Sequence, residues 1–186
     1  IFFRSRSVSS TLCTFWPRCP SIRRKLCGSR SKRSGSVTNG GGAGFQTGST
    51  MKAFTTAAAF AEGFRGDHAI NSPFHLPASK LNIERDCAGK RVFPKEDGVV
   101  NFAEFENGMY TLRTGLEMSV NTYFTQLTDQ VGLCNVVKMA KRSGIHRADG
   151  KKLSEVYSFT LGVNEIAPLT MANAYATFAA RGTHCD

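Results

Sequence analysis

Residues 48–63 read Gly-Ser-Thr-Met-Lys-Ala-Phe-Thr-Thr-Ala-Ala-Ala-Phe-Ala-Glu-Gly, an alanine-rich segment with high helix propensity. Apolar side chains recur along it at intervals of three and four residues, which is the spacing of one helix face. These positions are Met51, Phe54, Ala58 and Ala61. The glycine that closes the segment predicts the end of the helix. We therefore expect a helix over Ser49–Glu62.

Ser49 and Lys52 stand one turn apart at the start of this helix and form the first candidate site. Residues at i and i+3 share a helix face, so the lysine amine can act as the base that a serine hydroxyl needs to become a nucleophile. Backbone N–H groups and the dipole at a helix start stabilise the negative charge that develops in acyl transfer. The alternative is a capping serine beside a solvated lysine. A second match to the spacing, Ser29 to Lys32, shows how readily it arises.

Proline and Asn-Gly turns make residues 64–110 rich in loops, with short strands expected near Lys90–Phe93 and Val99–Phe102. The residues that follow have the apolar spacing and the end signals of helices. The expected ranges are Thr111–Met118, Thr122–Val131, about Leu133–Ser143 and Pro168–Arg181. The second half of the chain is therefore expected to be mainly helical.

A second candidate element, Ser119-Val-Asn121, falls between two of these predicted helices and is the one Ser-x-Asn sequence in the chain. A turn at this position could direct both polar side chains into a cleft. The alternative is that Ser119 or Asn121 simply caps the helix that begins at Thr122.

Three segments that occur in this order resemble the transpeptidase domain of penicillin-binding proteins. They are Gly48–Phe54, Tyr110–Thr122 and Ile166–Ala180. The resemblance covers about Gly40–Asp186 and is strongest to bifunctional, class A enzymes of actinobacteria. It implies an α+β fold of the penicillin-binding protein and serine β-lactamase type. We expect mostly its helical part here, with a truncated antiparallel sheet.

The resemblance also implies a peptidoglycan D,D-transpeptidase, which crosslinks stem peptides ending in D-Ala-D-Ala and is acylated by β-lactams. Ser49 would be the nucleophile and Lys52 its base. Ser119 would relay the proton to the departing D-Ala, and Asn121 would bind the substrate amide and orient the lysine. The family acts on the extracytoplasmic face of the cell membrane, so the same location is expected here, with a membrane contact only through a part of the parent protein outside this chain.

The Lys-Thr/Ser-Gly element of the family, which follows Ser-x-Asn on a strand, has no counterpart in this sequence. Arg142-Ser-Gly144 follows Ser-x-Asn but has the pattern of a helix end. The chain is expected to stop before that strand, and so to be an incomplete piece with weak or no activity. Two other functions remain open: a D,D-carboxypeptidase or β-lactamase-like hydrolase, and a non-catalytic module that recognises penicillin.

Charge separates an N-terminal arm from the rest of the chain. Residues 1–38 carry nine Lys and Arg side chains and no acidic one, whereas the whole chain has a net charge of +10. We expect this Ser/Arg-rich arm to be unstructured, or non-native sequence from a shifted reading frame, and residues 39–186 to be the partial domain. Nucleic-acid binding through the arm is disfavoured because it offers few aromatic side chains for base stacking.

Cysteines and histidines form no set with the spacing of a metal site, and the glycines of residues 40–48 fit neither nucleotide-binding fingerprint. Neither a metal nor another cofactor is therefore expected. No stretch approaches the roughly 18 apolar residues of a membrane span. Disulfides are permitted outside the cytoplasm, but spacing does not decide how Cys87, Cys134 and Cys185 pair.

Overall fold

The structure is a computed structural model that describes residues 43–82 and 84–184. The expected basic arm over residues 1–38 lies outside the described residues, and so does Cys185. The division of the chain near residue 38 therefore stays a prediction.

The α-helices of the described residues lie where the apolar spacing predicts them. They are α1 (Lys52–Ala61), α2 (Leu112–Glu117), α3 (Asn121–Val131), α4 (Leu133–Arg142) and α5 (Pro168–Ala179). At the start of the first predicted helix the chain instead forms a 3₁₀ helix, η3 (Gly48–Met51), which runs directly into α1. Two further 3₁₀ helices are η4 (Ala78–Lys80) and η5 (Tyr157–Leu161). None of the described helices is both long and apolar enough to cross a membrane.

The strands form antiparallel pairs of two. β1 (Phe45–Gln46) pairs with β8 (Glu165–Ile166), β2 (Ala69–Ser72) with β7 (Gly108–Thr111), β3 (His75–Leu76) with β6 (Val99–Val100), and β4 (Glu84–Arg85) with β5 (Arg91–Val92). The sequence predicts β5 and β6 but not the other strands. Helices with short antiparallel strands confirm the expected α+β class.

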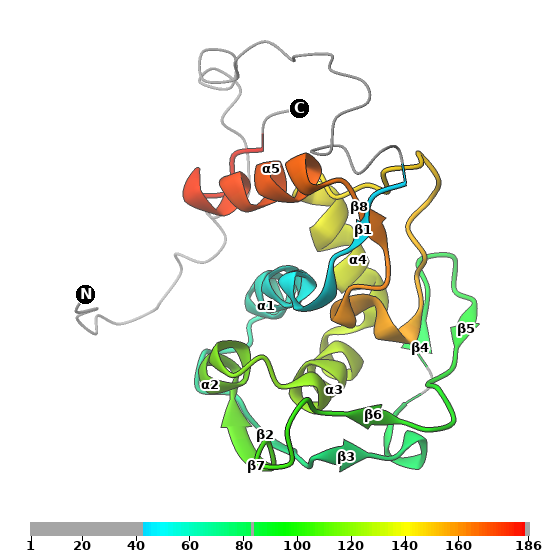
Figure 1. Ribbon diagram of the computed structural model, residues 1–186. Coiled ribbons are helices and arrows are strands. Elements are labelled where there is room, and N and C mark those ends of the chain that lie inside the picture. The colour runs from blue at the N-terminus through cyan, green and yellow to red at the C-terminus, as the bar shows by residue number, and fades with distance from the viewer. Residues whose placement is uncertain (1–42, 83, 185–186) are drawn as a thin grey trace, which may run out of the picture.

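The helix α1 lies at the centre of the molecule, with α5 above it, α4 to its right and α2 and α3 below it in Figure 1. Phe54, Ala58 and Ala59 of α1 are at most 1% exposed. Because alanine has no side chain beyond Cβ, it lets a neighbouring helix approach closely, which explains an alanine-rich sequence at the centre of the core. The core continues with buried residues of α3 and α4, among them Phe124, Leu127, Leu133, Val136 and Val137.

The segment η5 holds the start of η3 and α1 from one side. The backbone N–H of Gly48 donates to Gly162 O over 3.2 Å, just beyond the end of η5. The buried hydroxyls of Thr55 and Thr160 are 2.7 Å apart and hydrogen-bonded. Two contacts therefore fix the helix that carries Ser49 and Lys52 against residues more than a hundred positions later.

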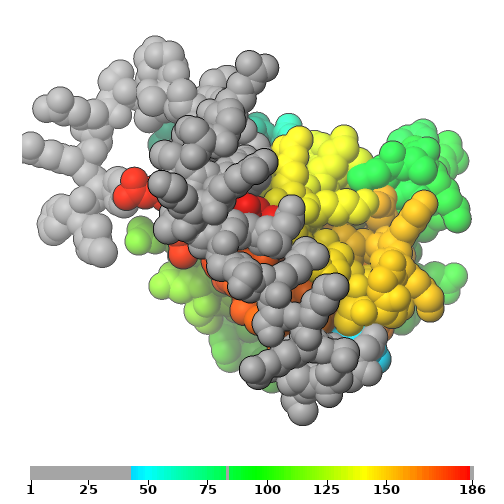
Figure 2. Space-filling view, turned by 90° about the horizontal axis from the view of Figure 1, so that it is seen from above, coloured from blue at the N-terminus to red at the C-terminus, as the bar shows by residue number. Residues whose placement is uncertain are grey.

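A disulfide joins Cys87, in the turn between β4 and β5, to Cys134 of α4. The two cysteines are 47 residues apart in the sequence. Figure 2 shows the green region of β4 and β5 at the edge of the molecule beside the yellow residues of α4. Glu155 adds a contact here, since its carboxylate accepts from Cys87 N and pairs with Lys141 at 2.8 Å. The disulfide thus ties a peripheral hairpin to the helical core.

Replacing both cysteines of this disulfide with serine is expected to lower the free energy of unfolding by about 2–4 kcal/mol, because a loop of this length loses considerable entropy when it is closed. Urea unfolding of the wild type and of Cys87→Ser/Cys134→Ser measures the loss. A reducing agent should lower the stability of the wild type by a similar amount and leave the double variant unchanged. Equal stability of the oxidised wild type and the variant would contradict the prediction.

Candidate active site

The link between α2 and α3 places the Ser-x-Asn element. At the end of α2, Ser119 N donates to Leu116 O over 3.1 Å and Val120 N donates to Gly115 O over 2.9 Å. This is the Schellman pattern, whose left-handed residue is usually glycine. Here that residue is Ser119, with φ of +58°. A non-glycine residue in this conformation is strained by about 1–2 kcal/mol, so the chain tolerates strain where it keeps a hydroxyl.

Lys52 lies against this strained turn. Its Nζ donates to the backbone oxygen of Ser119 over 2.5 Å, to Asn121 Oδ1 over 2.7 Å and to Ser119 Oγ over 3.1 Å. The ammonium group also lies 5.6 Å from the centre of the Phe124 ring. The structure therefore brings together three of the four residues that the sequence nominates, from segments 67 to 69 positions apart.

The environment of Lys52 favours its uncharged form. The residue is 0% exposed, and desolvation by burial lowers the pKa of its amine from 10.5 to about 8, with the negative charge of Glu106 opposing the shift. A lysine with this pKa is neutral in about one tenth of the molecules at pH 7, a fraction that allows it to accept a proton. Burial therefore increases the fraction of the amine that is free to accept a proton, although it makes the amine a weaker base.

The side-chain amide of Asn121 has one end on Lys52 and the other on the backbone of β6. Its Nδ2 donates to Val100 O over 3.0 Å, and its Oδ1 accepts from the lysine. The carbonyl of Val100 can only accept, so it fixes which end of the amide faces Lys52. Asn121 is the first residue of α3, and no side chain of the preceding residues caps that helix.

Ser49, the fourth candidate, lies one turn before Lys52 in η3 and is exposed. Its backbone oxygen accepts from Lys52 N. Within the described residues its hydroxyl makes no hydrogen bond, so the structure places Ser49 beside the Lys52 group without joining it. Because Ser49 is exposed, a substrate can reach it from the solvent side.

A pocket of about 160 Å³ adjoins this group of residues. Two of its lining residues contact Asn121, because Val100 O accepts from the amide and Thr125 Oγ1 donates to Asn121 O. The remaining lining residues are Lys95, Gly98, Val99, Tyr157, Ser158 and Leu161. The pocket therefore offers a mostly apolar wall next to the polar group.

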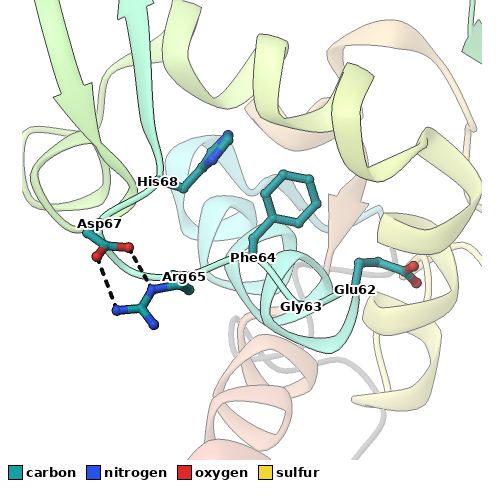
Figure 3. Close-up of a pocket in the computed structure, with 6 residues that line it drawn as sticks. All are labelled: Glu62, Gly63, Phe64, Arg65, Asp67 and His68. Atoms are coloured by element: carbon teal, nitrogen blue, oxygen red, sulfur yellow. Dashed lines mark hydrogen bonds and ion pairs between the residues drawn. The ribbon is translucent and has the colours of Figure 1, made fainter. Parts of the chain in front are cut away.

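A second pocket, of about 340 Å³, follows the end of α1 and is lined by residues 62–65, 67 and 68. Figure 3 shows the side chains of Arg65 and Asp67 pointing toward each other, and Arg65 Nε lies 3.1 Å from Asp67 Oδ1. His68 faces Gln130 instead, at 2.7 Å. Arg65, Asp67 and His68 thus each have a polar partner beside this pocket.

The sequence pattern does not identify two buried residues near Lys52, Glu106 and Asn101. Glu106 is 6% exposed and its carboxylate accepts from Phe102 N. Asn101 is 4% exposed and bonds to the start of α3. Both lie in the segment expected to be loops and strands, where the pattern carries no signal of burial. The expectation for Arg142-Ser-Gly144 is confirmed, since α4 ends at Arg142 and Gly144 has φ of +85°.

Comparison with known proteins gives a match over most of the chain. The family model described as the penicillin binding protein transpeptidase domain matches residues 37–186. Penicillin-binding protein 1A of Rickettsia felis is 32% identical over 137 residues, which are 74% of this chain and 15% of that protein. Penicillin-binding protein 1A of Aquifex aeolicus is 39% identical over 85 residues, or 46% of this chain and 11% of that protein.

Solved structures give the same result. The penicillin-binding protein PonA1 of Mycobacterium tuberculosis superposes with a TM-score of 0.57 and 27% identity, over 77% of this chain and 36% of that one. PonA1 in complex with penicillin V superposes with a TM-score of 0.56 and 28% identity, over 77% and 37%. The match thus spans little more than a third of the solved chains and 11–15% of these curated relatives.

Proposed function

The chain belongs to the penicillin-binding protein transpeptidase family, and from this premise we propose that it carries the acylation site of a peptidoglycan D,D-transpeptidase. The observation that carries the proposal is the buried amine of Lys52, held between Ser119 and Asn121 one turn after an exposed serine. Its lowered pKa, about 8, supports a base rather than a structural cation. A solvated first-turn lysine, the alternative reading of the sequence, does not fit a side chain with no exposed surface.

In the proposed reaction Ser49 Oγ attacks the carbonyl carbon of the penultimate D-Ala of a stem peptide ending in D-Ala-D-Ala. Neutral Lys52 accepts the hydroxyl proton, and the backbone N–H of Ser49 stabilises the oxyanion of the tetrahedral intermediate. Collapse of the intermediate breaks the peptide bond, and the proton passes through Ser119 Oγ to the nitrogen of the departing D-Ala. The contact of 3.1 Å between Lys52 Nζ and Ser119 Oγ supports this route.

The amine of a neighbouring stem peptide then attacks the acyl carbon and loses a proton to Lys52, and the bond between Ser49 Oγ and the acyl group breaks as Lys52 passes that proton to the serine oxygen. Water in place of the amine would make the protein a D,D-carboxypeptidase or a β-lactamase-like hydrolase, since the first half-reaction is shared. Asn121 Oδ1 faces Lys52, and its Nδ2 faces Val100. The amide of Asn121 therefore orients the lysine, and in the proposed complex its second N–H and the second lone pair of its oxygen bind the substrate amide.

β-Lactams carry a reactive amide in place of the scissile bond, so we propose that they acylate Ser49 and are its second class of ligand. A similar solved structure supports this, because PonA1 was solved in complex with penicillin V. Stem peptides lie outside the cytoplasm, and an extracytoplasmic location is accordingly part of the proposal. The disulfide of Cys87 and Cys134 is compatible with that compartment.

Covalent labelling tests the proposal. Incubation with a fluorescent penicillin should raise the intact mass of the protein by one whole antibiotic molecule, because ring opening loses no atoms. Ser49→Ala should take no label, whereas Ser79→Ala, which alters another serine of a 3₁₀ helix, should label like the wild type. Equal labelling of the wild type and Ser49→Ala, or a folded wild type that never reacts, would refute the assignment. Product analysis with an added acceptor amine separates crosslinking from hydrolysis.

A further inference from the structure

The buried side chain of Asn101 makes hydrogen bonds to three different segments of the chain. Its Nδ2 lies 2.7 Å from Glu106 O, 3.0 Å from Thr122 Oγ1 and 3.2 Å from Pro73 O. Its Oδ1 accepts from Thr122 N over 2.8 Å. One amide thus joins the end of β2, the turn before β7 and the first turn of α3.

Asn101 supplies the cap that α3 lacks. The Thr122 N–H is one of the donors that a helix start leaves without an intrahelical partner, and the residue before the helix, Val120, has no side chain that could accept it. The acceptor instead comes from 21 positions upstream. Because this bond fixes the backbone of Thr122, it also fixes that of the adjacent Asn121.

Two hydrogen bonds therefore connect residues 100 and 101, at the end of β6, with residues 121 and 122, at the start of α3. Val100 O accepts from the Asn121 side chain, and the Asn101 side chain accepts from Thr122 N. The first hydrogen bond determines which end of the Asn121 amide faces Lys52, and the second fixes the backbone position from which the Asn121 side chain extends. Thr122 Oγ1 strengthens the second connection by donating to Pro73 O over 2.9 Å.

We infer that Asn101 is a positioning residue for the acylation site, which holds Asn121, and through it Lys52, in the orientation that proton transfer requires. The inference rests on the proposed function. Asn101 contacts neither Lys52 nor Ser49 by hydrogen bond, so its effect passes through α3. An error of about 1 Å in the position of a catalytic group can slow a reaction by about 100-fold, which is why a capping residue outside the site matters to its chemistry.

Asn101→Ala tests the inference against a matched control, Asn164→Ala. Asn164 is 1% exposed and also bridges backbone groups, with Ser154 N over 2.7 Å and Ser154 O over 3.1 Å, but it makes no contact with α3 residues by hydrogen bond. Both variants should be less stable. Only Asn101→Ala should slow penicillin acylation of the folded fraction, by about 10- to 100-fold. Thr122→Val, which is nearly isosteric, should slow penicillin acylation less than Asn101→Ala does. It replaces Asn101→Ala as the test variant if that protein does not fold.

A spectroscopic readout separates this inference from the proposed function. In protein labelled with ¹⁵N-asparagine, the side-chain N–H signals of Asn121 should shift and exchange faster with water in Asn101→Ala or Thr122→Val, and should stay unchanged in Asn164→Ala. Unchanged Asn121 signals, or equal slowing by the two asparagine variants, would overturn the positioning assignment. A wild-type protein that penicillin never acylates would refute the proposed function. The Asn121 signals would still show whether Asn101 positions Asn121.

Discussion

Replacing Lys52 with methionine is expected to slow acylation of Ser49 by about 10²–10⁴-fold, the range that a general base contributes. Methionine matches the length of the lysine stem and removes the amine, so the buried volume is kept while the base is lost. The burial of Lys52 and its contacts with Ser119 and Asn121 make its amine the base that the variant removes from the proposed site. Stopped-flow or quench labelling with a fluorescent penicillin measures the rate.

The wild-type rate should depend on pH in a way that the variant lacks. Neutral Lys52 is the reactive form and its pKa is about 8, so acylation should rise with pH through pH 8 and then level off. Glu106→Gln should move this midpoint to lower pH, because the negative charge that raises the lysine pKa is removed. A profile that is flat between pH 6 and 9 would count against Lys52 as the base.

Stability should follow the same titration with a defined sign. The folded state lowers the pKa of Lys52 from 10.5 to about 8, so between these values the unfolded chain holds more protons. The free energy of unfolding should therefore rise with pH in this window, by at most about 3 kcal/mol, and stay level below it with respect to this group. Lys52→Met should lack the rise. Lys138→Met, at an exposed position of α4, should keep both the rise and the acylation rate.

The sequence predicts α1 and its neighbours because their signals are local. Alanine content and the spacing of Met51, Phe54 and Ala58 need no information from elsewhere in the chain, and the glycines at the helix ends mark conformations that few other residues adopt. The same holds for the pairing of Ser49 with Lys52, which one helical turn determines. These local signals, together with the Ser119-Val-Asn121 sequence, are the parts of the fold and site that could be predicted.

The remaining parts depend on contacts between distant segments. The burial of Lys52 results from packing against residues 67 to 69 positions later, and nothing within η3 or α1 indicates it. Asn101 sits in a segment with the pattern of a short strand, where a polar residue reads as solvent-facing. Its value as a cap appears only when α3 is beside it. The left-handed Ser119 is likewise hidden, because the pattern of a helix end leads one to expect glycine there.

Gly162→Ala is expected to lower the free energy of unfolding by about 2–4 kcal/mol and to disturb the serine as well. Gly162 has φ of +82°, and a Cβ placed on it would lie 2.2 Å from both N and O of Gly48. These are backbone atoms, which cannot rotate away as a side chain can. The added methyl group must therefore push η3 from η5 and break the hydrogen bond between Gly48 N and Gly162 O.

Gly150→Ala supplies the control for this effect, because Gly150 has a similar φ of +74° and a Cβ added there would meet no atom within 4 Å. Its alanine variant should show only the backbone strain, about 1–2 kcal/mol. Gly48 directly precedes Ser49, so Gly162→Ala should also slow penicillin acylation of the folded fraction, whereas Gly150→Ala should not. If both variants lose the same stability and acylate at the wild-type rate, then the contact of η5 with η3 does not position the serine, and the support for Ser49 must come from α1 alone.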